Sequence, residues 1–326
     1  MDCWRGAFRP DDEIVVLRAY TRQREMLVKS GATHIQHMQK AMQQMNLRLD
    51  AVVSDITGDT GLRIIKAILG GERDVTKLGA LKDYRCRSSE QEIAESLVGN
   101  YRPEHLFSLK QALELFEIYQ GKIRECEAEM ESYLKSMTHK RDDEPPRSAE
   151  AEKRNRLSFN VRDEAWKLTG VDLFRIRGLN SETILRIIGE VGVDVASRFP
   201  TEKTFSSWLG LSPNNRISGG KVLLSKTKPS KNRAAAAFRQ AAVSLERSQS
   251  ELGAFYRRMK ARLGPGKAIT ATAHKIARIY YHLIKTGEEY VDKGAKAYEE
   301  KQKERMLKNL RKRAQGYGFK LVPVAS

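Results

Sequence analysis

The sequence contains few cysteines and no long apolar run. Its three cysteines, Cys3, Cys86 and Cys126, lie far apart and form no CxxC pair, which excludes a disulfide framework and a zinc-finger spacing. No apolar run approaches the ~18 residues that a membrane-spanning helix needs. The first residues, MDCWRGAFRPDDE, lack the apolar core of a signal peptide. We therefore expect a protein of the reducing cytoplasm with no membrane partner.

The sequence also lacks a recognisable metal or nucleotide motif. No His-Glu motif, Walker loop or Rossmann fingerprint occurs. His34 and His37 are three residues apart on an expected helix, but no acid or cysteine stands beside them at ligand spacing. The acids at 11–13 open a helical run, where the helix dipole favours them. We expect no metal site in this chain.

What the sequence does contain is an uneven charge. Its 326 residues carry 59 Lys plus Arg and 41 Asp plus Glu, a formal charge of +18. Residues 1–200 are balanced at 32 of each sign, whereas residues 201–326 carry 27 basic and 9 acidic side chains. The whole excess therefore lies in the C-terminal part, which indicates a polyanion partner there, with nucleic acid as the first candidate. A basic solvated surface without a partner is the alternative.

Apolar residues make up 40% of the chain, enough for a packed core, and their periodicity predicts a mainly α fold. Ile35, Met38, Met42, Met45 and Leu49 form one helical stripe that we interpret as core. A short helix is expected between glycines at 58 and 71, and another after a capping box at 89–92. In the second half we expect helices at 181–191, 202–209, 231–248, 251–263, 267–286 and from about 295 to 313.

The longest regular pattern follows Pro103, which stands at a helix start. The a and d positions of more than four heptads are held by Leu106, Leu109, Leu113, Phe116, Ile123, Met130, Leu134 and Met137, with Gln120 and Glu127 at the remaining a positions. This pattern predicts a coiled-coil arm, either a helical hairpin or a dimerising arm. One long helix packed within its own domain is the alternative.

A charged stretch with Pro145-Pro146 divides the chain. It is nearly free of large apolar groups, as interdomain linkers are. The organisation that we predict is a helical and coiled-coil region at 1–138, a linker at 139–165, a second domain at 166–291 and a basic helical tail at 292–326.

The segment FRIRGLNSETILRIIGEVG, residues 174–192, has the sequence of a helix-hairpin-helix. In such a motif the N–H groups at the start of the second helix can bind a phosphate without reading the base. The residues expected to contact nucleic acid here are Arg177, Gly178 and Asn180. Asn180 stands where a second glycine is usual, and Asn tolerates a positive φ better than most residues. An ordinary αα-hairpin is the equally weighted alternative.

The loop WLGLSPNNRISGGKVLLSKTKPSKNRAAAAFRQAA, residues 208–242, carries Ser218-Gly219-Gly220 among basic side chains. A serine hydroxyl needs a base or a positive environment before it acts as a nucleophile. Guanidinium and ammonium groups can hold a phosphodiester, and glycines allow the backbone to approach it. The candidate contacts are Arg216, Gly219, Gly220, Lys221, Lys226, Lys228, Lys231 and Arg233. By spacing alone, most S-G-G triplets are turns.

Several segments, taken in order, resemble the insertion sequence 110 (also 116/902) family of bacterial transposases. RGAFRPDDEIVVLRAYTRQREMLV, HIQHMQKAMQQMNLRL and GNYRPEHLFSLKQALELFEIYQ are similar to the family's middle region. RGLNSETILRIIGEVG, SWLGLSPNNRISGGKV and GAFYRRMKARLGPGKAITATAHKIARIYYHLIKTGEEYV are similar to its C-terminal transposase domain. The likeness extends over residues 4–323.

The resemblance implies a recombinase that moves its own element on DNA. The family joins a RuvC-like nuclease domain with metal-binding acids to a coiled-coil region and a serine-bearing domain. Its serine follows a G-L-[ST]-P segment, which here places it at Ser218, attacking a DNA phosphodiester to form a phosphoserine linkage. By the same resemblance we expect a structured guide RNA, homo-oligomers, and Mg²⁺ for the nuclease domain.

The sequence departs from the family at its start, because the strands and acids of the nuclease domain have no counterpart. Met1-Asp2-Cys3-Trp4 resembles the end of that domain's last motif, so Asp2 is a candidate remnant of its last metal-binding acid. One acid cannot hold the catalytic metal alone. We therefore expect a truncated transposase. The alternative is a non-catalytic, nucleic-acid-binding, oligomerising remnant.

Overall fold

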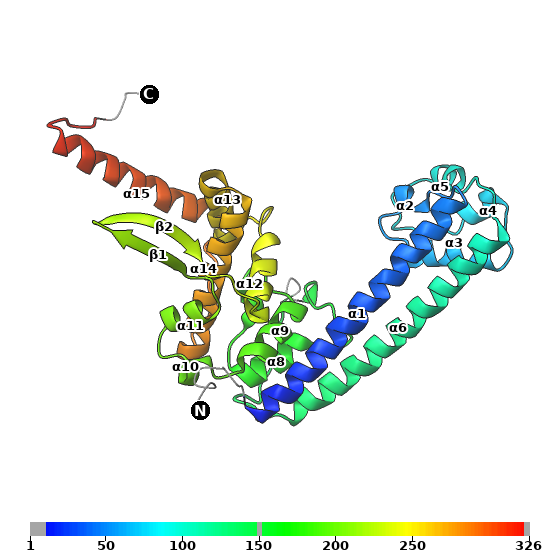
Figure 1. Ribbon diagram of the computed structural model, residues 1–326, viewed down its shortest axis with the longest axis horizontal. Helices are drawn as coiled ribbons and strands as arrows, with labels where there is room; N and C mark the ends of the chain where they lie inside the picture. The colour runs from blue at the N-terminus through cyan, green and yellow to red at the C-terminus, as the bar shows by residue number, and fades with distance from the viewer. Residues whose placement is uncertain (1–10, 149–151, 323–326) are drawn as a thin grey trace. The chain divides into compact units, whose positions relative to one another are not determined.

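The computed structural model describes residues 11–148 and 152–322, and these are mostly helical (Figure 1). The mainly α fold expected from the sequence is confirmed. Asp2 and Cys3 lie outside the described residues. By its internal packing the chain divides into two compact units. We call residues 22–129 the arm unit; the main unit consists of residues 1–21 and 130–326.

The arm unit has a core that two long helices share with four short ones. The long helices are α1 (Asp12–Gln44) and α6 (Pro103–Ser136), each of which also contributes a few residues to the main unit. The short helices are α2 (Leu49–Val52), α3 (Asp59–Leu69), α4 (Val75–Gly79) and α5 (Glu90–Ser96). The stripe of Met38, Met42 and Met45 is fully buried in this core, as its spacing predicted. The Ser89–Glu92 capping box at the start of α5 is also confirmed.

The heptad stripe of α6 is buried within this same chain. In the arm unit its residues at 109, 113, 116 and 123 are all less than a tenth exposed. At one polar a position, Glu127 accepts a hydrogen bond from Arg24 of α1 at 2.7 Å, and both side chains are largely buried. Gly31 of α1 lies so close to α6 that a Cβ there would stand 3.3 Å from the Cβ of Tyr119. The arm is therefore a helical hairpin, while its coiled-coil register and any dimerisation stay predictions.

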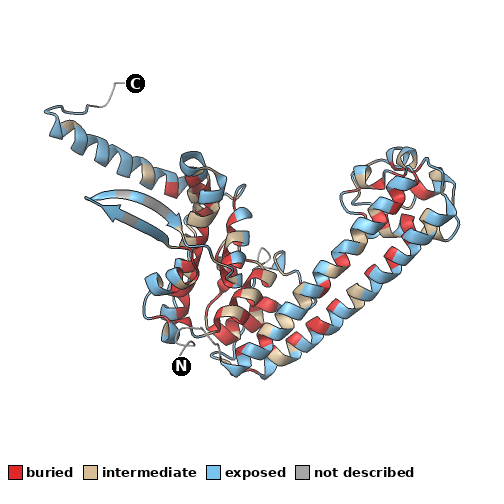
Figure 2. Cartoon of the chain, viewed as in Figure 1, coloured by how far each residue is buried: buried red, intermediate tan, exposed pale blue. Residues whose placement is uncertain are grey.

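The main unit is built around helix α14, which packs against four other helices. Its elements are α8 (Val161–Thr169), η1 (Leu173–Arg175), α9 (Ser181–Val191), α10 (Val195–Arg198), α11 (Glu202–Trp208), β1 (Pro213–Ser218), β2 (Lys221–Thr227), α12 (Arg233–Val243), α13 (Glu251–Leu263), α14 (Pro265–Thr286) and α15 (Gly294–Gly316). Phe205 lies at the centre of the core, with its ring 5.3–6.4 Å from those of Phe199, Trp208, Phe238, Tyr280 and Tyr281. Figure 2 shows buried residues along these helices, whereas α15 is mostly exposed.

The helices of the main unit agree with the expected ones, with small shifts at their ends. The helix expected at 231–248 begins instead at Arg233, because the Asn232 side chain accepts a hydrogen bond from the N–H of Ala235 at 3.0 Å and caps it. The helix expected from 267 begins at Pro265, whose missing N–H costs nothing in the first turn. The greater difference is at 213–227, where a loop was expected and the structure has two strands.

The stretch expected as a linker belongs to the main unit and packs within it. The backbone N–H groups of Lys140 and Arg141 both donate to the carbonyl of Lys167. The Arg141 guanidinium also lies over the Trp166 ring, 4.5 Å from its centroid. Helix α8 begins at 161, inside the expected linker, and residues 149–151 are outside the description. The domain boundaries taken from composition stay a prediction.

Within the described residues, no helix combines the length and the apolar character that crossing a membrane requires.

Candidate functional site

The Ser218 segment is a β-hairpin rather than the loop that the sequence suggested. Strands β1 and β2 run antiparallel and pair Ser218 with Lys221 across a turn formed by Gly219 and Gly220. These glycines have φ of +53° and +74°. Two consecutive positive φ values characterise the turn whose twist matches that of a hairpin, and glycine adopts them without strain. The serine therefore stands at the tip of the hairpin, at the end of β1.

The outer half of the hairpin carries exposed apolar side chains among its described residues. Arg216 pairs with Leu224 and Ile217 with Val222, so Leu223 is an additional residue that forms a bulge in β2. Such bulges increase the twist of a two-stranded ribbon. The apolar side chains of Ile217 and Leu223 are 63% and 69% exposed. The outer hairpin is thus presented to solvent.

The base of the hairpin is held by the helical core. Gly210 has a φ of +68°, and a Cβ there would lie 2.6 Å from the Cβ of Ser230, on the other leg of the hairpin. The flanking Leu209 and Leu211 are buried. On the second leg, the Ser230 hydroxyl accepts a hydrogen bond from the N–H of Asn232, the residue that caps α12. The fold therefore fixes where the hairpin starts and leaves its tip accessible.

Ser218 and the lysines of the hairpin are exposed. Among the described residues no group forms a hydrogen bond with the Ser218 hydroxyl, and none forms an ion pair with Lys221, Lys226, Lys228 or Lys231. Arg233 differs, because its guanidinium lies 3.6 Å from the Glu190 carboxylate. For Arg216 the description covers the backbone in β1 and not the side chain.

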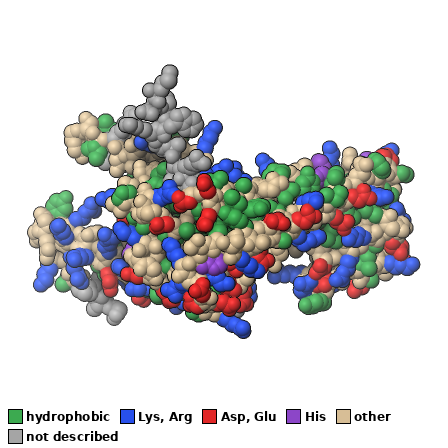
Figure 3. Space-filling model, turned by 90° about the horizontal axis from the view of Figure 1, so that it is seen from below, with side chains coloured by type: hydrophobic (Ala, Val, Ile, Leu, Met, Phe, Trp, Pro, Cys, Tyr) green, Lys and Arg blue, Asp and Glu red, His purple; other side chains and the backbone are tan. Residues whose placement is uncertain are grey.

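The electrostatic surroundings of the hairpin are uniformly positive in sequence. Between Glu202 and Glu246 there is no Asp or Glu, while eight Lys and Arg occur. Figure 3 shows Lys and Arg side chains gathered at the end of the main unit where Figure 1 draws the hairpin and α15. A DNA backbone that approaches this end meets attraction from several ammonium groups.

The residues of the expected helix-hairpin-helix have mainly structural contacts. Gly178 has a φ of +92°, and a Cβ there would lie 2.6 Å from the carbonyl oxygen of Ala241 in α12. Only glycine permits that approach of the turn to the helix. Arg177 lies 3.7 Å from the carboxylate of Asp292. The candidate contacts of this turn, Arg177, Gly178 and Asn180, are therefore distant from the Ser218 hairpin in the sequence, and the contacts described for them are with residues outside the hairpin.

The expected role of Asn180 as a residue with positive φ is wrong. Its φ is −129°, which is ordinary extended backbone, and it is the N-cap of α9. Its side chain accepts from the N–H of Thr183 at 2.9 Å, and the Thr183 hydroxyl accepts from the N–H of Asn180 at 2.8 Å. The N–H of Ser181 donates to the carbonyl of Arg154. The N–H groups of Asn180, Ser181 and Thr183 at this turn are therefore already used within the protein, and phosphate binding at this turn stays a prediction.

Residues 172–257 match the family model described as the transposase IS116/IS110/IS902 family. This segment is a transposase segment of that family. The match covers the hairpin with Ser218 and the helices α9 to α12, and over these residues it confirms the resemblance seen in the sequence. A search among curated proteins gave no match to the chain. Transposases act on DNA, so DNA is the partner that the family indicates.

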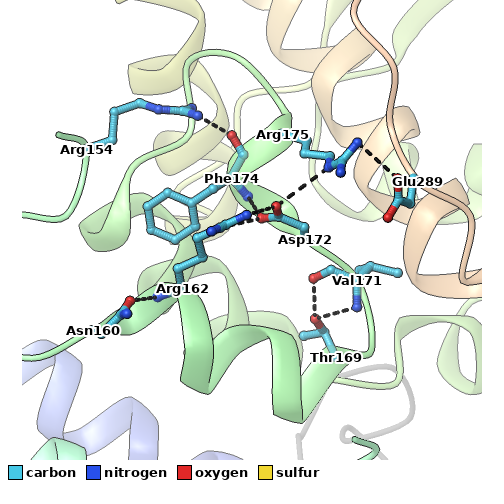
Figure 4. Close-up of polar contacts among 9 residues, drawn as sticks. All are labelled: Arg154, Asn160, Arg162, Thr169, Val171, Asp172, Phe174, Arg175 and Glu289. Carbon is cyan, nitrogen blue, oxygen red and sulfur yellow. Dashed lines mark hydrogen bonds and ion pairs between the residues drawn. The ribbon is translucent and has the colours of Figure 1, made fainter. Parts of the chain in front are cut away.

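The transposase segment begins at an acid that sequence reasoning missed. Asp172 is buried and receives two hydrogen bonds from the Arg162 guanidinium, at 3.3 and 2.6 Å (Figure 4). Its carboxylate also accepts from the N–H of Phe174 and lies 3.7 Å from the Nε of Arg175. Arg175 reaches Glu289 on its other side, at 3.0 Å. Of these contacts, the sequence could have suggested only the Asp172–Arg175 ion pair, because the two residues are three apart.

No cluster of His, Cys, Asp and Glu that could hold a metal ion is found in the described part of the chain. The ring of His34 stacks on Tyr119, with centroids 5.3 Å apart, and contacts His37 edge to face at 5.6 Å. The metal-binding acids that the resemblance associates with Mg²⁺ remain an expectation for the nuclease domain of the family.

Proposed function

We propose that this chain is the serine-bearing part of an insertion-sequence transposase, with Ser218 as the nucleophile in DNA strand cleavage. The single observation that carries the proposal is the position of Ser218, exposed at a two-glycine hairpin tip among exposed lysines. Gly219 and Gly220 have no atom that a Cβ would meet within 4 Å. A phosphodiester can therefore approach the tip without a steric barrier from these residues.

The chemistry of this step follows from the groups at the tip. The Ser218 oxygen would form a bond to the DNA phosphorus, the bond from phosphorus to one sugar oxygen would break, and the serine proton would end on that leaving oxygen. Negative charge develops on the phosphate oxygens as the reaction proceeds. Lys221, paired directly across from Ser218, supplies positive charge at the tip, and Lys226, paired with Asn214, supplies it further down the hairpin for the flanking DNA backbone. Strand joining would reverse the step with another sugar hydroxyl.

The same proposal includes partners that support the reaction in the family. We propose that a structured guide RNA, a second copy of the chain and Mg²⁺ bound by nuclease-domain acids take part, and that the reaction occurs in the cytoplasm. The surplus of positive charge after residue 200 fits binding to both DNA and RNA. The two-helix arm offers a surface for association between copies.

A covalent adduct tests the nucleophile. The protein would be incubated with a suicide DNA substrate, donor DNA, guide RNA and a separately supplied nuclease domain, then denatured and analysed for protein joined to DNA. The wild-type chain should form the adduct, and so should the control Ser212→Ala, which removes a serine hydroxyl six residues before Ser218. Ser218→Ala should not. An adduct that persists in Ser218→Ala would remove Ser218 from the role.

A non-catalytic binding protein is the second candidate. It is favoured by the Ser218 hydroxyl, which no group among the described residues hydrogen-bonds and so none positions as its base. In that case DNA or RNA binding should be strong and salt-dependent, Ser218→Ala should not alter it, and no adduct should form under any complementation. Binding that does not weaken with salt would contradict both candidates.

A further inference from the structure

The main unit contains a cavity of about 390 Å³ that no residue of the Ser218 hairpin lines. Five arginines line it, drawn from the stretch before α8, from α8 itself and from the turn after it, and Tyr290 is also part of the lining. These arginines are Arg147, Arg154, Arg162, Arg175 and Arg177. The volume falls within the ~300–1,000 Å³ of pockets that hold small molecules. We call it the arginine pocket.

The lining is positive on balance. Two carboxylates, Asp172 and Asp292, face the five guanidinium groups. Asp172 is engaged in two hydrogen bonds with Arg162, with both side chains less than a tenth exposed. Arg147 is exposed, and in the described part of the chain no carboxylate lies within ion-pair distance of it. An incoming anion would therefore meet surplus positive charge rather than a neutral network.

Arg154 and Arg175 are held in place by their neighbours. The Arg154 guanidinium donates to the backbone carbonyls of Phe174 and Leu179 (Figure 4 shows the first of these). Arg175 is held between Asp172 and Glu289. Side chains that are already fixed lose little conformational freedom when a ligand binds. Guanidinium forks also match the spacing of phosphate oxygens, which ammonium groups do not.

Tyr290 adds a neutral donor and an aromatic ring to the pocket. Its pKa is raised, first by burial and then by the nearby carboxylates Asp292 and Glu251, so that its hydroxyl keeps its proton at neutral pH. No acceptor for that hydroxyl is found among the described residues. Aromatic rings beside arginines are the usual platform for a nucleobase next to its phosphate.

We propose that the arginine pocket binds the phosphate group of a nucleotide, with Arg147 and Arg177 at the phosphate and Tyr290 beside the base. The site is independent of Ser218. Two sources share this chemistry: a nucleotide unit within a nucleic-acid strand, and a free nucleotide or phosphate ion.

The test is equilibrium binding by the full chain in the Ser218→Ala background. The probe is a fluorescently labelled adenosine monophosphate, followed by anisotropy, with inorganic phosphate, unlabelled adenosine monophosphate, adenosine and a short single-stranded DNA as competitors. Adenosine monophosphate and phosphate should compete, and adenosine should compete at least tenfold less well. Competition by the DNA at lower concentration than by the nucleotide assigns the pocket to a strand; failure of DNA to compete assigns it to a free nucleotide.

Matched variants separate the pocket from general charge. Arg147→Gln with Arg177→Gln should weaken binding of the probe about tenfold or more, as loss of charge-assisted hydrogen bonds does. Arg48→Gln with Arg124→Gln removes the same charge from exposed positions of the arm unit and should change it less than twofold. Tyr290→Phe should weaken binding while leaving the melting temperature in place, and Arg147→Gln alone serves if the double variant fails to fold.

The proposal is overturned if the probe does not bind, if adenosine competes as well as its monophosphate, or if both double variants weaken binding equally. Because all measurements are made without the serine hydroxyl, a missing covalent adduct would leave this result unaffected. Conversely, a result that overturns nucleotide binding at the arginine pocket would leave the adduct test of Ser218 unaffected.

Discussion

Replacing Asp172 with alanine should destabilise the main unit strongly. Asp172 is 2% exposed in its side chain and Arg162 8%. The carboxylate accepts two hydrogen bonds from Arg162 and caps η1 by accepting from the N–H of Phe174 at 3.1 Å. Alanine would leave the Arg162 guanidinium buried without its main counter-charge and would leave the N–H of Phe174 without an acceptor.

The expected size follows from these contacts. Breaking a buried ion pair by removing one partner costs about 3–5 kcal/mol, because a buried charge is left uncompensated. Loss of the cap of η1 accounts for about 1 kcal/mol of this total. With a urea m-value of about 3 kcal/mol/M, the unfolding midpoint should fall by about 1–1.7 M. Asp172→Asn keeps an oxygen that can accept the hydrogen bond from Phe174, so its unfolding midpoint should fall less than that of Asp172→Ala.

The assay is urea unfolding followed by tryptophan fluorescence, since Trp166 and Trp208 both lie in the main unit. The double variant Arg162→Met/Asp172→Leu removes both charges and should recover most of the loss, because an apolar pair of similar size replaces a buried ion pair well. The exposed-pair control Glu246→Gln should leave the midpoint in place. If the double variant is as unstable as Asp172→Ala, the uncompensated charge is not the cause and the reasoning fails.

Three further outcomes can be measured. Gly178→Ala should destabilise the main unit by about 2 kcal/mol or more in denaturant unfolding, because Gly178 has a positive φ and lies against α12. The control Gly121→Ala in α6 should not destabilise the protein, because a Cβ there meets nothing within 4 Å. Gly220→Val should speed amide hydrogen exchange in the hairpin without lowering the melting temperature, because φ is +74° there and no atom packs against it. Burial, and after it the nearby charge of Arg278, lowers the pKa of His274. The contribution of this neutral histidine to the free energy of unfolding is therefore complete above its ordinary pKa of about 6.5, and it is lost as the pH falls below that value. His274→Gln should make the melting temperature fall less steeply over that acidic range.

Helices could be predicted well because their signals are local. A capping side chain three residues before its partner, a Pro in the first turn and an apolar stripe every three or four residues are all visible in one sequence. The methionine stripe and α6 are found for that reason. The sequence could not decide whether the α6 stripe packs on another copy or on its own chain. That choice depends on α1, whose Arg24 meets the polar a position Glu127 from 103 residues away.

The site was predicted less completely, for two physical reasons. The strands around Ser218 carry lysines on an exposed ribbon and lack the alternation of apolar residues that marks a half-buried strand. The Gly-Gly turn was the available hairpin signal. Asp172 and Arg162 are brought together only when α8 and η1 pack, and Asn180 was misassigned because a residue with a tolerable positive φ is equally suited to cap a helix.

The positive charge of this chain is of two physical kinds, and the fold keeps them apart. The lysines near Ser218 are exposed, hydrated point charges on a hairpin, which attract any phosphate backbone and lose that attraction as salt rises. Arg154, Arg162 and Arg175 of the arginine pocket are held by carbonyls and carboxylates, so their geometry matters more than their net charge. The proposed function, in which Ser218 reacts with a strand that the protein holds, would use both kinds of charge. The lysines can follow a moving backbone, whereas a pocket with several guanidinium groups can keep one phosphate in place.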